Sequence, residues 1–186
     1  MSFLNELPVE KRDLVVSLPY RVGLWISQSD ASGGSDSDAR EQQALSSILH
    51  AYAEEVFGSE TVQHIISGTI SQQANWPRWG QNMNEVIVDC RHAVEVLSGV
   101  VDPKEVNAFK KHLVEIAESV ALAFREVQPD MKLGLKVRLY LDYYKNKLKA
   151  LRDKRTYKTF EEYLNISPGE RRALITLAEA LKTSYN

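Results

Sequence analysis

Residues 103–124 read PKEVNAFKKHLVEIAESVALAF, and this stretch decides the fold. Asp102 precedes it as an N-cap residue, and Pro103 takes the first helical position, where a missing N–H costs no hydrogen bond. Apolar residues then recur at intervals of three and four, the period of one helix face. They are Val106, Phe109, Leu113, Ile116, Ala117, Val120, Ala121 and Phe124. The pattern predicts a long core helix that Pro129 ends.

The same helical period extends over most of the chain, and no run of four or more residues alternates as a half-buried strand would. We therefore expect an all-α protein. Pro8 and Pro19 suit first-turn positions, so they predict two short helices near 8–17 and 19–29. Further helices are expected near 37–57, from Ser59 to a break at 75–80, near 82–98, over 133–156 and after Ser167.

Charge divides the chain into two regions. Residues 1–130 hold 10 Lys/Arg against 19 Asp/Glu, whereas residues 131–158 hold 10 Lys/Arg against 2 Asp/Glu. We interpret 1–130 as an acidic helical bundle, and 131–186 as a basic amphipathic helix plus a capped C-terminal helix packed on it. Such a division suits either an acidic body that pairs with its own basic segment or a basic surface kept for an anionic partner.

Composition limits the class of protein. The chain has 186 residues, 44% hydrophobic and 26% charged, which indicates a globular protein rather than a disordered or fibrous one. No apolar stretch approaches the roughly 18 to 20 residues needed to cross a bilayer, and no secretory signal is expected. A single cysteine, Cys90, cannot form an internal disulfide, so we expect a cytoplasmic protein.

A loop rich in Ser, Gly and Asp is expected at Ser27–Asp38, and its acidic residues are a candidate site for one divalent cation such as Ca²⁺. Twelve residues run from Asp30 to Glu41, the length of an EF-hand loop, although Ser35 stands where that loop has glycine. In the alternative interpretation the loop binds nothing, and its acids favour the positive end of the next helix. The candidate ligands are Asp30, Asp36, Asp38 and Glu41.

Trp76, Arg78 and Trp79 form an aromatic and cationic cluster in the expected break at 75–80. Exposed Trp and Arg side chains concentrate binding energy at interfaces, so these three residues are candidates for contact with a partner. The alternative is that both indoles fold back over the bundle.

Two stretches of the chain resemble the TerB-like (tellurite-resistance) family. They are LPYRVGLWI at 18–26, which leads to Asp30 and then Glu41, and LVEIAESVALA at 113–123. The likeness covers roughly residues 14–127. It implies an all-helical fold, a role in stress response and an acidic, metal-binding surface at the loop described above.

The motifs of common enzyme classes do not occur: the sequence has no GxSxG, P-loop, HExxH, GxGxxG or CxxC. The spacing of Asp89–His92 and His112–Glu115 suits surface pairs on a helix better than a metal centre. Cys90 is expected to be a small buried hydrophobe.

We therefore expect a non-enzymatic interaction or stress-response module with a protein partner, and homo-oligomerisation stays open. The alternative is an adaptor that binds nucleic acid or an acidic lipid through residues 132–158, where Lys145, Lys149 and Arg152 would contact phosphates.

Overall fold

The computed structural model describes residues 3–29, 35–55, 58–123 and 168–183. Within these ranges every regular element is helical, which confirms the predicted all-α fold. Three short 3-10 turns are present: η1 (Phe3–Asn5), η2 (Gln73–Asn75) and η3 (Met83–Glu85). The α-helices are α1 (Val9–Ser27), α2 (Ser35–Glu55), α3 (Glu60–Ser71), α4 (Trp76–Trp79), α5 (Val86–Ser98), α6 (Pro103–Ala123) and α9 (Pro168–Leu181). None of the described helices is both long and apolar enough to span a membrane.

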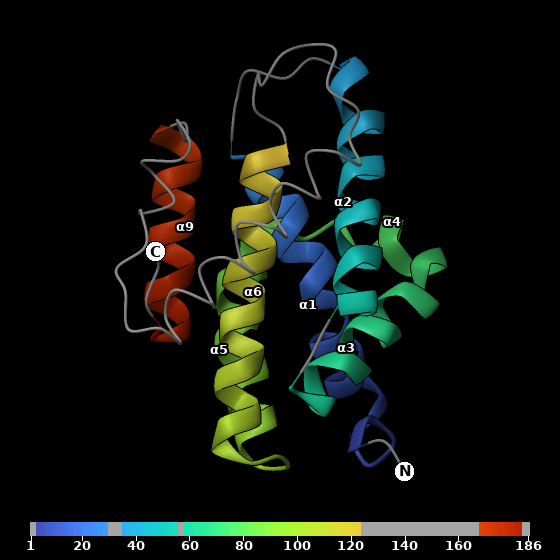
Figure 1. Cartoon of the computed structure of the whole chain (residues 1–186), viewed down its shortest axis with the longest axis vertical. Coiled ribbons are helices and arrows are strands. Elements are labelled where there is room, and N and C mark those ends of the chain that lie inside the picture. Colours follow the sequence, from blue (N-terminus) through green and yellow to red (C-terminus); the bar gives the residue numbers. More distant parts are fainter. Residues whose placement is uncertain (1–2, 30–34, 56–57, 124–167, 184–186) are drawn as a thin grey trace.

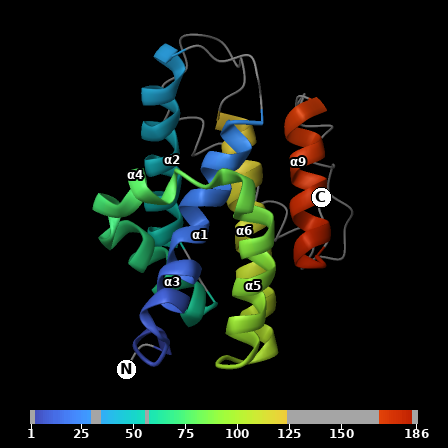
Figure 2. The same cartoon turned by 180° about the vertical axis from the view of Figure 1, so that it is seen from behind.

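Helix α1 is the centre of the bundle. It packs against α2 and α3 on one side and against α5 and α6 on the other, and the two opposite views show it between these pairs (Figures 1 and 2). All residues from Val15 to Gly23 are buried, including the charged Arg21. Residues 9–14, the first part of α1, are exposed or half-buried, so only the second part of α1 lies in the core.

Gly23 allows α1 to approach α2 closely. A Cβ atom at this position would overlap with Leu45 Cδ1 and would lie 3.3 Å from Val120 Cγ2. Both neighbours are buried, so a side chain here would force the core to rearrange.

The predicted break between two helices at Pro19 is wrong, because α1 continues through this residue. An internal proline removes one backbone hydrogen bond and disturbs the preceding turn. Two hydroxyl groups donate to carbonyl groups of that turn: Ser17 Oγ to Leu14 O at 2.9 Å, and Thr69 Oγ1 of α3 to Val16 O at 2.6 Å. The carbonyl group that loses its partner at Pro19 is that of Val15, so these bonds do not replace the missing one, but the Thr69 bond joins this turn of α1 to α3.

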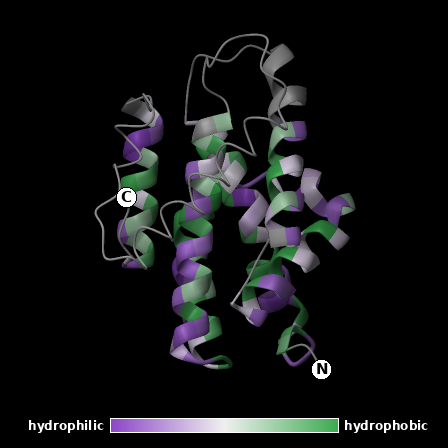
Figure 3. Ribbon diagram, viewed as in Figure 1, coloured by the Kyte–Doolittle hydropathy of each residue, from purple (hydrophilic) through white to green (hydrophobic). Residues whose placement is uncertain are grey.

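The predicted helix starts agree with the structure at several points. Ser59 caps α3, since its hydroxyl oxygen accepts a hydrogen bond from Val62 N at 3.1 Å. Gly58 has φ +103°, a conformation that favours glycine. The apolar stripe of α6 is buried from Val106 to Ala121, and Figure 3 shows apolar and polar residues on different sides of the helices.

Helix α9 packs against α5 and α6 and, to a smaller extent, against α1. Its buried side chains include Leu174, Leu177, Ala178 and Leu181, the four positions that the sequence pattern predicts. The segment 133–156, predicted as a basic helix, lies outside the described residues.

Candidate functional site

The segment after α3 is helical where the sequence suggests a break. Trp76 and Trp79 lie on the short helix α4, and both indoles are buried. Trp76 Nε1 donates to Thr69 O at 3.0 Å, and its ring stacks on Tyr20 with centroids 4.5 Å apart. This placement corresponds to the alternative in which the indoles fold back over the bundle, and it leaves Arg78 as the exposed member of the predicted trio.

Asp13 of α1 is the hydrogen-bond acceptor that fixes α4. Arg78 Nη2 lies 3.0 Å from Asp13 Oδ1 and 3.1 Å from Oδ2, while Trp79 Nε1 donates to Oδ1 at 3.1 Å. The carboxylate therefore has both a cationic partner and a neutral donor. Its negative charge is compensated within the protein.

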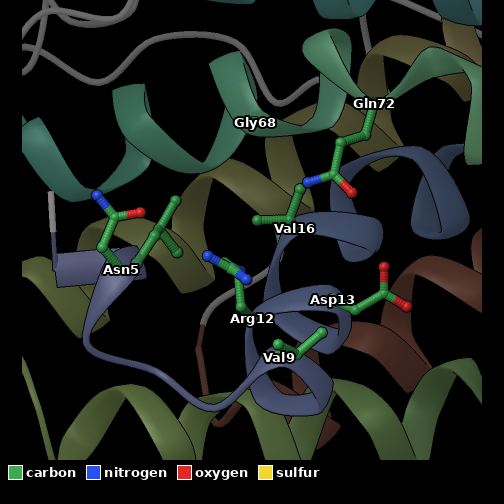
Figure 4. A pocket seen from close by; sticks show the side chains of 8 residues that line it. Asn5, Val9, Arg12, Asp13, Val16, Gly68 and Gln72 are labelled. Atoms are coloured by element: carbon green, nitrogen blue, oxygen red, sulfur yellow. The ribbon is translucent and has the colours of Figure 1, made fainter.

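Beside Asp13 lies an open groove of about 400 Å³ between α3 and the start of α1 (Figure 4). This volume falls in the range of small ligand sites. The residues that line it are Leu4, Asn5, Val9, Arg12, Asp13, Val16, Gly68 and Gln72. Apolar side chains and amides thus share the groove with one Arg and one Asp.

Gly68 brings α3 close to the floor of the groove, because a Cβ atom there would lie 3.2 and 3.3 Å from the two γ-methyl groups of Val16. Val9 at the rim is 69% exposed, which is the largest value among the exposed large hydrophobic residues of the described chain. Val9 therefore places one exposed apolar side chain at the rim of the groove.

Arg12 gives the groove its charge. Figure 4 shows this side chain extending between Asn5 and Val16, with Gln72 reaching in from α3. No hydrogen bond or ion pair joins the guanidinium to any other residue of the described ranges. Because Arg78 already neutralises Asp13, the groove carries one uncompensated positive charge.

The segment 61–84, which contributes Gly68 and Gln72 to the groove, is poor in charge, a feature that the sequence reasoning missed. Residues 61–84 contain a single Asp, Glu, Lys or Arg, which is Arg78, whereas the overall 26% would give about six in 24 residues. Seven of the 24 residues are Asn or Gln. Depletion of Lys, Glu and Asp with retention of Arg is typical of protein interfaces. A count of charge per segment would have found this signal.

A second hollow, of about 490 Å³, lies where the turn between α5 and α6 meets the start of α3. Glu105 lines it and accepts hydrogen bonds from Ser59 Oγ at 2.7 Å and Thr61 N at 3.0 Å. Although partial burial opposes the shift, these bonds hold the pKa of Glu105 below its usual value. Glu105 thus acts as a structural acceptor for the first turn of α3.

The candidate cation ligands are only partly described. Asp30 and residues 31–34 lie outside the described residues, while Asp36, Asp38 and Glu41 lie within α2. Helix α2 begins at Ser35, two residues earlier than predicted, so positions 35–41 of the EF-hand-like stretch are helical. Among residues whose placement is described, no three His, Cys, Asp or Glu side chains are grouped as a metal site requires.

Of the predicted partner-binding residues, Lys145, Lys149 and Arg152 lie outside the described ranges. The two predicted acid–histidine pairs can be placed. Asp89 pairs instead with Arg21, and His112 Nε2 lies 3.8 Å from Glu115 Oε2.

Burial shifts the pKa values of Cys90, which is fully buried, and of His112, which is half-buried. Burial raises the pKa of the Cys90 thiol to about 12, so the thiol stays protonated and is not a nucleophile at neutral pH. This agrees with the predicted role of Cys90 as a small hydrophobe. Burial also lowers the pKa of His112, whose Nδ1 lies 2.8 Å from Ala108 O.

Comparison of the chain with protein-family models, with curated proteins and with solved structures finds no match.

Proposed function

We propose that this protein is a helical binding module, and that a segment of a partner protein lies in the groove between α1 and α3. The observation that carries the proposal is the pairing of exposed Val9 and unpaired Arg12 in a groove that is completed by the charge-poor segment 61–84. Packing of the bundle requires neither feature, because both side chains precede the buried part of α1.

Site-specific photo-crosslinking in the native host tests this proposal. A photoreactive residue at Ser71, exposed at the end of α3 near the groove, should yield a discrete adduct. The matched probe at Glu95, exposed on α5, should not. Val9→Asp should suppress the Ser71 adduct, because it places a charge on the apolar rim. Equal adducts at both probes, or a Ser71 adduct unaffected by Val9→Asp, would contradict the proposal.

A second part of the proposal follows from the resemblance to the TerB-like family and the acidic stretch at 30–41. We propose that the module acts in a stress response and binds one divalent cation there. Calorimetric titration with Ca²⁺ tests the site: a saturable heat is expected that Asp36→Asn with Asp38→Asn removes. The absence of heat and of a thermal shift at millimolar Ca²⁺ would remove this part and leave the groove unaffected.

The alternative adaptor function rests on the excess of eight positive charges in residues 131–158. Binding to nucleic acid or anionic vesicles through Lys145, Lys149 and Arg152 should weaken as salt rises, and reversal of these three charges should abolish it. Binding that resists both changes would rule this alternative out.

A further inference from the structure

We infer that the groove between α1 and α3 selects an acidic peptide, with one carboxylate of the peptide on Arg12 and its apolar side chains between Val9 and Val16. The inference rests on the proposed binding function and names the chemistry of the partner segment.

Charge complementarity identifies the occupant. Asp13 is the acidic residue that lines the groove, and Arg78 and Trp79 already occupy its oxygens. The nearby Glu6, Glu10 and Lys11 are exposed and do not line the groove. The Arg12 guanidinium is therefore free to bind an anion from outside, and its planar fork of donors suits a carboxylate.

A peptide fits better than a small metabolite or a phosphorylated segment. The groove is open to the surface, and its residues Gly68 and Gln72 belong to the charge-poor segment 61–84, so a longer chain can extend beyond it. The amide of Asn5 can pair with a peptide N–H or C=O, and the NH₂ group of Gln72, whose oxygen accepts from Asn75 Nδ2 at 3.2 Å, can donate to a peptide C=O. Recognition of phosphorylated segments uses clusters of Arg, whereas the groove offers one unpaired Arg.

Fluorescence anisotropy of the full chain with two pools of labelled octapeptides tests the inference. Both pools carry the same apolar residues at alternate positions, and they differ in having Glu and Asp or the isosteric Gln and Asn between them. The acidic pool should bind about five- to tenfold more tightly, because hydrogen bonds to a charged group exceed neutral ones. The preference should shrink as salt rises.

Arg12→Gln should remove the preference for the acidic pool, and the matched control Lys11→Gln should retain it. Both positions lie outside the core, and a thermal melt establishes that each variant is folded. Equal binding of the two pools to the native chain would overturn the carboxylate inference and leave the binding function in place. A preference that survives in Arg12→Gln would overturn the role of Arg12. Binding of neither pool at millimolar peptide would overturn the inference, while the Ser71 crosslink decides the binding function separately.

Discussion

Two Arg–Asp pairs connect α1 to other helices, one to α5 and one to α4, and they differ in burial. The inner pair joins Arg21 to Asp89 at 2.6 Å, with side chains 9% and 22% exposed. The outer pair joins Asp13 to Arg78 at 3.0 Å, with side chains 30% and 59% exposed. The same chemistry thus occurs in the core and at the surface, eight residues apart on one helix.

This difference in burial predicts that the inner pair contributes to the stability of the fold, whereas the outer pair affects the charge of the groove. Arg21 also donates to Asn82 O at 3.0 Å, so loss of its partner would leave a buried cation with one neutral acceptor. The outer pair is in contact with solvent, where ion pairs contribute little to stability. Its consequence is chemical: Arg78 neutralises Asp13 and leaves Arg12 as the free charge of the groove.

The largest expected effect is on the inner pair. Asp89→Leu should lower the free energy of unfolding by about 2 to 3 kcal/mol, because it leaves the buried Arg21 without a counter-ion. Urea denaturation measures the change. The double variant Arg21→Met with Asp89→Leu should be more stable than Asp89→Leu alone, since both charges are then removed. If the double variant were less stable than Asp89→Leu, packing of these side chains and not their charge would determine stability at this site.

The next effect concerns Thr69, which supports the turn of α1 between the two pairs. Thr69→Val removes a buried hydroxyl whose one proton can be donated to Val16 O, at 2.6 Å, or to Ile65 O, at 3.0 Å, and it should cost about 1 to 2 kcal/mol. The matched control is Thr176→Val on α9, where an exposed hydroxyl donates to Arg172 O and the expected change is within about 0.5 kcal/mol. Equal losses of unfolding free energy in the two variants would show that the bond from Thr69 to Val16 O stabilises the protein no more than an exposed hydrogen bond does.

The helices could be predicted from sequence because their signals are local. The period of α6, the Ser59 cap and the buried leucines of α9 all depend on residues within a few turns of each other. The continuous path of α1 through Pro19 could not be predicted in this way, because its buried residues pack against helices from distant parts of the chain.

The candidate site could be predicted only in part for the same reason. Trp76, Arg78 and Trp79 were recognised by composition, but their orientation depends on Asp13, which is 65 residues from Arg78. The groove joins Asn5, Arg12 and Gln72 from distant parts of the chain, so no spacing rule relates them. The acidic stretch 30–41, a candidate cation site beside the interpretation that it binds nothing, is a local signal, and it stays a prediction.

Burial also sets the pH dependence of stability, through His112. Its pKa in the folded protein is lowered by burial and by Lys111 despite the bond to Ala108, so below the unfolded value of about 6.5 the unfolded chain binds more protons. Stability should therefore fall as pH drops through 6.5 and level off below the folded pKa. His112→Gln should flatten this part of the curve in denaturation at pH 5 to 8.

The smallest effect on stability, and the sharpest test of the comparison, is expected at the outer pair. Arg78→Ala should cost under about 1 kcal/mol, because the pair is exposed and Trp79 still donates to Asp13. The freed carboxylate would then offset the charge of Arg12, so the preference for acidic over amide peptides should decrease. Asp13→Asn removes that carboxylate and should retain the preference. If Arg78→Ala instead lowered the free energy of unfolding as much as Asp89→Leu, the contrast between the two pairs would be wrong. The outer pair would then stabilise the fold as the inner pair does.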